Sequence, residues 1–124
     1  MSRFTDKLVV SLEKDGEHWV LEADFEYYTD LLGERVYINV PQGFETDFAS
    51  IPKIFLPLIA YKDKFNKAAV VHDWLYRSKV YDRKTADRIF LEAMLVLNIN
   101  KFKAYLFYYT VRLFGWIFWN RSKK

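Results

Sequence analysis

The stretch Ala68-Ala-Val-Val-His-Asp-Trp-Leu-Tyr-Arg77 decides how the rest of the chain is interpreted. It predicts a helix from about Lys64 to Ser78, with His72 and Asp73 adjacent in an otherwise apolar run. Positions three and four apart share a helix face, so His72 lies in line with apolar and aromatic residues: Ala68, Ala69, Leu75 and Tyr76. A histidine on such a face needs a hydrogen-bond partner, because an unpaired buried polar group is costly.

The next helix offers that partner. It is predicted from about Arg83 to Leu97, with Asp82 as its N-cap, and it carries Asp87 on its apolar face. The short turn between the two helices makes them antiparallel neighbours. At a rise of ~1.5 Å per residue, His72 and Asp87 differ in height by about one turn or less, which predicts contact between them.

A third helix is predicted from about Lys101 to Trp119, after a break at Asn98–Asn100. It is aromatic nearly all round, with Arg112 inside it and the basic tail Arg121–Lys124 behind it. The apolar run is shorter than the ~20 residues of a membrane span, but tryptophans beside basic residues suit a membrane interface. This helix therefore predicts either contact with a phospholipid surface, or a place in the bundle core or at a protein interface.

The residues before these helices alternate as β-strands do. We expect strands at Lys7–Leu12, His18–Thr29 and Glu34–Val40, with a tight turn at Asp15–Gly16. The fold class is therefore α+β, with a three-stranded antiparallel meander packed on a bundle of about three helices. We expect one domain over residues 1–124: the meander in 1–40, an irregular loop or short helix in 41–63, and the helical part in 64–124.

Composition narrows the function classes. The 124 residues contain no cysteine, which excludes disulfide scaffolds and thiolate metal sites. The net charge of +3 is compatible with anionic partners without requiring them, and no nucleic-acid recognition motif is present. The segment Met1–Lys7 lacks the apolar core of a signal peptide.

The residues on the two facing helices predict a catalytic arrangement. A neutral His72 can take a proton from water, while Asp87 fixes its tautomer and stabilises the imidazolium that forms. Tyr76, one turn after His72, can hydrogen-bond to Asp87 and orient the pair. Asp73 is rotated by about 100° from His72, so it can instead hold a hard cation such as calcium, with Asp47 completing the shell. Such a cation would polarise a carbonyl or phosphoryl oxygen.

Each of these residues also has a purely structural interpretation. His72 can be a core histidine bonded to a backbone carbonyl, and Tyr76 can be a core residue. Asp87 can pair with Arg83 or Lys84 one turn earlier, and Asp73 can pair with Arg77. Asp47 can serve as a helix cap.

Three segments resemble a family of short phage and prophage proteins of unknown function. They are Gly43–Pro52, Ala69–Tyr76 and Ala86–Met94, and the match covers most of the chain beyond Gly33. The resemblance implies a phage or prophage source, and hence a location in the host cytoplasm or in the phage particle. It implies no established activity.

A narrower resemblance concerns His72-Asp73-x-x-Tyr76 followed by Ala86-Asp87-x-x-Phe90. This pattern looks like the active-site helix pair of phospholipases A2, especially the small prokaryotic and parvoviral forms. The resemblance implies that His72 is the base, that Asp73 binds calcium, and that Tyr76 and Asp87 orient the histidine. The glycine-rich calcium loop of that family is missing here, and the Thr46–Ser50 loop is the only candidate substitute.

Two hypotheses follow from these observations. In the first, the chain is a phage-type, phospholipase A2-like protein that hydrolyses an ester, with a lipid as substrate. In the second, it is a non-enzymatic virion, tail or assembly protein, in which the His/Asp cluster is a buried structural network. The partners under the second hypothesis are other phage proteins or a second copy of the chain.

Overall fold

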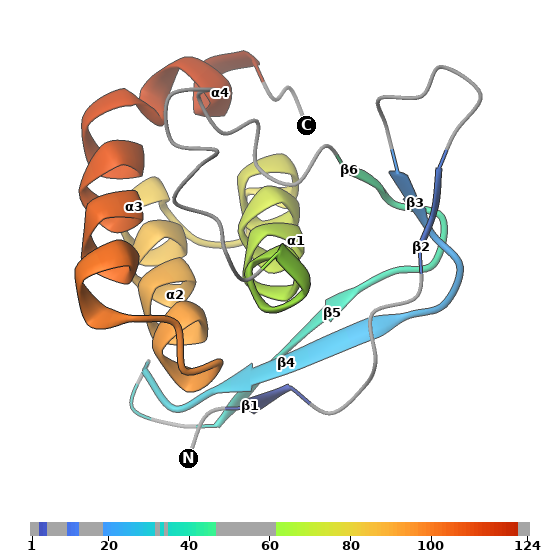
Figure 1. The fold of residues 1–124 in the computed structure, drawn as a ribbon. Helices are drawn as coiled ribbons and strands as arrows, with labels where there is room; N and C mark the ends of the chain where they lie inside the picture. The colour runs from blue at the N-terminus through green and yellow to red at the C-terminus, as the bar shows by residue number, and fades with distance from the viewer. Residues whose placement is uncertain are drawn as a thin grey trace.

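The computed structural model describes residues 3–4, 10–12, 19–31, 33, 35–46 and 62–121 (Figure 1). In these ranges short strands precede helices, which confirms the predicted α+β class. The strands are β1 Arg3–Phe4, β2 Val10–Leu12, β3 Trp19–Leu21, β4 Phe25–Thr29, β5 Val36–Val40 and β6 Glu45–Thr46. The helices are α1 Lys62–Ser78, α2 Arg83–Val96, α3 Lys101–Phe114 and α4 Trp116–Arg121.

The strands form two antiparallel sheets rather than one meander. One sheet has the order β1-β4-β5, and the other has the order β2-β3-β6. The predicted neighbours β2–β3 and β4–β5 do pair, with Val10 opposite Leu21 and Tyr27 opposite Ile38. The short strands β1 and β6, which the sequence pattern did not predict, each complete a sheet.

The single strand predicted over His18–Thr29 is wrong, because it divides into β3 and β4 at Glu22–Asp24. The residues that follow β5 explain the division. The backbone of Leu21 bonds to both Gly43 and Phe44, and the side chain of Asp24 accepts a hydrogen bond from the Gln42 backbone at 2.7 Å. Residues 42–44 therefore bond to the segment around Leu21–Asp24 where a neighbouring strand would otherwise pair with it. At this point the chain leaves the sheet of β3 and enters the sheet of β4.

The helices agree closely with the sequence pattern up to residue 114. Asp82 caps α2 by accepting a hydrogen bond from the Thr85 backbone, and Asn100 caps α3 in the same way from Phe102. Asn98 has a positive φ of 62° at the predicted break. The third predicted helix, however, is interrupted at Gly115, which separates α3 from α4.

One hydrophobic core joins strands and helices. Its buried residues include Leu21, Tyr27 and Val40 from the sheets and Ala69, Phe90 and Phe107 from the helices. The half-buried carboxylate of Glu92 in α2 accepts hydrogen bonds from the hydroxyl groups of Tyr27 and Thr29 in β4. Figure 1 accordingly shows the helices gathered on one side and the strands on the other, with β4 and β5 passing beneath α1 and α2. This packing fixes α1 and α2 against each other.

Candidate functional site

The ring of His72 is held between aromatic side chains on the inner face of α1. The residues predicted to share this face, Ala68, Ala69, Leu75 and Tyr76, are all buried. The His72 ring stacks on Phe90 of α2 with a centroid separation of 4.4 Å, and the Tyr76 ring lies 4.3 Å away. His72 itself is 4% exposed, so its orientation is fixed by packing.

Asp87 receives side chains from three helices. Its Oδ1 atom lies 2.8 Å from Nε2 of His72, and it accepts a hydrogen bond of 2.6 Å from the Tyr76 hydroxyl. Its Oδ2 atom accepts a hydrogen bond of 2.8 Å from Arg112 of α3. The expected contacts of Asp87 with His72 and Tyr76 are therefore present. We call these residues, together with Arg83, the Asp87 network.

Arg112 is the member that sequence reasoning missed. It is the charged residue placed inside the aromatic run of α3, and that position was the signal that it points to a buried anion. Arg83 lies farther from Asp87, at 3.5 Å, and its guanidinium donates instead to the backbone carbonyls of Val111 and Arg112. The predicted pairing of Asp87 with Arg83 is therefore present, but it is longer than the contacts of Asp87 with His72 and Arg112.

The charges of the network follow from these contacts. Burial raises the pKa of Asp87, but the hydrogen bonds from His72, Tyr76 and Arg112 outweigh burial and hold this pKa below its ordinary value. Burial and the Asp87 carboxylate both raise the pKa of Tyr76 above its ordinary value. At neutral pH, Asp87 is thus an ionised acceptor and Tyr76 a protonated donor.

This arrangement selects one tautomer of His72. An ionised carboxylate can only accept, so Nε2 of His72 carries the proton and Nδ1 of the neutral ring carries the lone pair. Among the residues that the structure describes, none forms a hydrogen bond with Nδ1. That nitrogen is the atom with which His72 can accept a proton.

Of the two predicted metal ligands, the structure describes Asp73 but not Asp47. Asp73 lies half-buried on α1, next to His72 in the chain. Asp47 and the rest of the loop to Ser50 lie outside the described residues. Among the described ranges, no group of three or more histidine and acidic side chains could hold a metal ion. Calcium binding at Asp73 and Asp47 therefore stays a prediction.

Gly115 lets α4 pack against the Asp87 network. A Cβ atom at this buried position would lie 2.4 Å from the Tyr76 hydroxyl and 3.0 Å from the Arg83 guanidinium. The next helix then places Trp119 edge-on against the Tyr76 ring, with centroids 5.2 Å apart. The residue between α3 and α4 is thus a position with no room for a side chain, which the aromatic pattern alone did not reveal.

We expect Gly115→Ala to lower the free energy of unfolding by about 1–3 kcal/mol, because the added methyl group overpacks a filled site. Equilibrium urea unfolding measures this change. Leu113→Ala, at an exposed position two residues earlier, should change stability by less than about 0.5 kcal/mol. Equal losses for both variants would contradict the close approach at Gly115.

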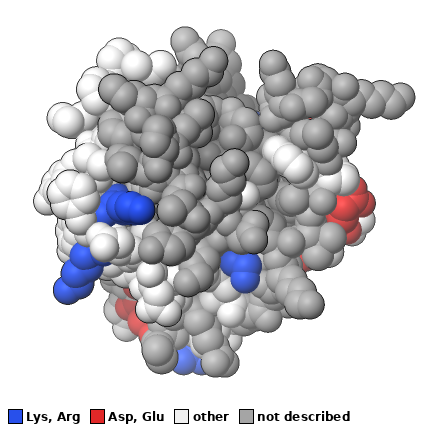
Figure 2. All heavy atoms as spheres, viewed as in Figure 1, with Lys and Arg blue, Asp and Glu red and all other residues white. Residues whose placement is uncertain are grey.

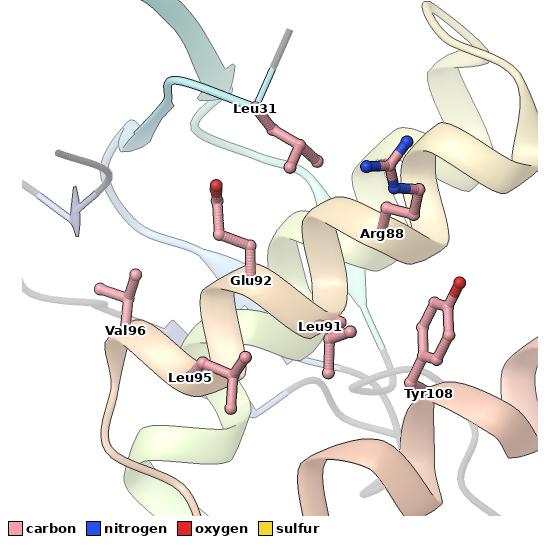
Figure 3. A pocket seen from close by; sticks show the side chains of 7 residues that line it. All are labelled: Leu31, Arg88, Leu91, Glu92, Leu95, Val96 and Tyr108. Carbon is pink, nitrogen blue, oxygen red and sulfur yellow. The ribbon is translucent and has the colours of Figure 1, made fainter. Parts of the chain in front are cut away.

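A separate depression lies beside α2. It has a volume of about 470 Å³, and its lining combines Leu31, Arg88, Glu92 and Tyr108 with apolar side chains of α2 (Figure 3). His72 and Asp87 do not line it. It is therefore a different surface from the Asp87 network.

Comparison with known proteins identifies the family. Residues 19–111 match the model for a protein of unknown function, DUF1353. The chain is also 37% identical over 109 residues to the uncharacterized protein y4iH of Sinorhizobium fredii, which covers 86% of this chain and 44% of the relative. The chain thus spans less than half the length of that relative. No solved structure matches. Because the family match covers residues 19–111, well over half of the chain, the chain belongs to the DUF1353 family of proteins of unknown function.

Proposed function

We propose that this protein is an ester hydrolase of phage type with a phospholipase A2-like site, in which His72 activates water. One observation carries the proposal: Nε2 of His72 lies 2.8 Å from an ionised Asp87, which leaves Nδ1 as the basic nitrogen. A histidine oriented in this way is a suitable general base, because its tautomer is fixed before the reaction begins.

The proton movements at this site are as follows. His72 takes a proton at Nδ1 from a water molecule, and the resulting hydroxide attacks the ester carbonyl. The imidazolium that forms is stabilised by Asp87, and the same proton then passes to the leaving alkoxide. The Tyr76 hydroxyl donates a hydrogen bond to Oδ1 of Asp87, the same atom that accepts from Nε2 of His72. Tyr76 therefore limits rotation of the Asp87 carboxylate. Arg112 holds the other oxygen, Oδ2.

In the proposed enzyme, Asp73 would be a calcium ligand. That carboxylate, with Asp47 and neighbouring backbone carbonyls, would hold the ion, which supplies stabilisation of the developing oxyanion when bound. Carboxylate and carbonyl oxygens are the donors that this cation prefers. Lipid esters are the substrate class that the phospholipase A2 resemblance suggests.

A second function has its own support. Asp87 is fully buried and is paired with Arg112 as well as with His72, so the network joins three helices without needing any substrate. This supports a non-enzymatic phage virion, tail or assembly protein, located in the particle or in the host cytoplasm, in which the network serves stability. Its partners would be other phage proteins or a second copy of the chain.

The deciding experiment is turnover of mixed phospholipid vesicles by the purified protein, with calcium or with a chelator. We expect fatty acid to be released with calcium and not with chelator, because the oxyanion would lose its cation. Asp73→Asn should require a higher calcium concentration, whereas the exposed Asp30→Asn should behave as wild type. Absence of release at every calcium concentration, together with the protein's presence in purified phage particles, would favour the structural function instead.

A further inference from the structure

One face of α3 is apolar and uncovered. Ala104, Phe107 and Val111 face the core, whereas a second set of residues at spacings of three and four occupies the opposite side of the helix. We call this set the α3 outer face: Phe102, Tyr105, Tyr109 and Leu113. Phe102 is 75% exposed and Leu113 is 66% exposed, which is unusual for side chains of this kind at helical spacing. In Figure 1, α3 lies at the outer edge of the helical layer.

The aromatic surface extends beyond these four residues. The ring of Tyr108 contacts the rings of both Tyr105 and Tyr109, so the three tyrosines form one cluster. Phe114 and Trp116, both more than half exposed, continue the surface at the end of α3. Tyrosine and tryptophan combine an apolar body with a polar group, which suits the boundary between lipid headgroups and acyl chains.

The charge of this part of the chain is strongly one-sided. Residues 101–124 contain six of the 19 lysines and arginines and none of the 16 acidic residues. The other residues, with 13 basic and 16 acidic side chains, carry a net charge of −3. On the face shown in Figure 2, the largest group of acidic residues (red) lies at the edge where β2, β3 and β6 are found, away from α3. The aromatic surface thus belongs to a segment of 24 residues whose charged side chains are all basic.

We propose that the α3 outer face docks on the surface of an anionic phospholipid membrane. The aromatic residues would insert between headgroups, while the exposed Lys101 at the start of α3 would contact lipid phosphates. A second copy of the chain fits less well, because a symmetric contact would place the two basic segments against each other. Among the described residues, no helix is long and apolar enough to cross a membrane.

The depression beside α2 continues the same surface. Tyr108 lines it and also belongs to the tyrosine cluster next to the α3 outer face. Figure 3 shows Arg88 and Leu91 of α2 on the side of the depression that Tyr108 approaches. Its lining is mainly apolar, with Arg88 and Glu92 as the charged side chains, and offers room for part of an acyl chain. Membrane docking does not depend on whether His72 is catalytic.

Co-sedimentation of the full chain with vesicles tests this inference. We expect the protein to bind vesicles that contain about one third phosphatidylglycerol and to bind pure phosphatidylcholine at least about fivefold more weakly, since each basic residue near the surface adds attraction. The double variant Phe102→Ser with Tyr109→Ser should lower the partition coefficient about tenfold or more, because it removes two inserting rings.

A matched control is available in Tyr37, which is as exposed as Tyr109, at 57%, but lies on β5. Tyr37→Ser should bind as wild type does, and the double variant should keep the wild-type melting temperature. Three results would each overturn the inference: no binding of the wild type to either vesicle, equal binding by the double variant, or a wild-type dimer that the double variant abolishes. The last would assign the face to a second copy of the chain.

Discussion

Asp87→Ala is expected to lower the free energy of unfolding by about 3–5 kcal/mol, because it removes one partner from a buried set of charged and polar groups. Asp87 is fully buried, and its two oxygens receive His72, Tyr76 and Arg112. Without the carboxylate, the Arg112 guanidinium loses its paired charge, and His72 and Tyr76 lose their acceptor. Urea unfolding followed by circular dichroism measures the loss.

The exposed ion pair between Asp30 and Arg35 provides the control. These atoms lie 3.8 Å apart and both side chains are about half exposed, so Asp30→Ala should lower stability far less than Asp87→Ala does. If Asp87→Ala does not fold, Asp87→Asn gives the measurement, since it keeps the shape and one acceptor oxygen. Losses at Asp87 no larger than that at Asp30 would show that the network does not stabilise the fold.

The same carboxylate predicts an acid dependence of stability. The pKa of Asp87 in the folded protein is held below its ordinary value of 3.8. A group with a depressed pKa contributes stability that is present above the ordinary value and is lost as the pH falls through the folded-state value. Asp87→Asn should therefore lose less stability than wild type when the pH is lowered below about 4.

The helical part of the fold was predictable because its signals are local. The caps Asp82 and Asn100 and the apolar faces of α1 and α2 are properties of neighbouring residues. The division of the predicted His18–Thr29 strand was not predictable in this way, since it depends on backbone bonds between Leu21 and a loop more than twenty residues later. Alternation of apolar and polar residues predicts which side chains of a strand face the core, but it does not predict which sheet the strand joins.

In the candidate site, too, the contacts between neighbouring elements were predictable and those between distant elements were not. Helix periodicity and a short turn were enough to bring His72, Tyr76 and Asp87 together, because the two helices are consecutive. Arg112 comes from α3, and its partner could not be found from spacing alone. Gly115 was missed for the same reason, since its neighbours Tyr76 and Arg83 belong to other helices. Contacts between distant elements depend on packing that the local sequence does not describe.

Under the proposed function, His72→Asn is expected to reduce the rate of ester hydrolysis by about 10²–10⁴-fold, which is the usual contribution of a general base. Asparagine has no basic nitrogen that can take a proton from water. Its amide is too short to replace Nε2 as a donor to Asp87, but Tyr76 and Arg112 still hold the carboxylate, so the protein should stay folded with a lower melting temperature. Fatty-acid release from phospholipid vesicles at saturating calcium, together with thermal unfolding, measures both quantities.

Tyr76→Phe separates catalysis from packing at this site. The substitution keeps the ring beside His72 and deletes only the hydroxyl that donates to Asp87. A positioning function predicts a rate loss about one to two orders of magnitude smaller than that of His72→Asn, with little change in substrate binding. A folded His72→Asn protein with the wild-type rate would remove His72 from the chemistry. The Asp87 network would then serve stability, because its contacts to Arg112 do not involve the histidine.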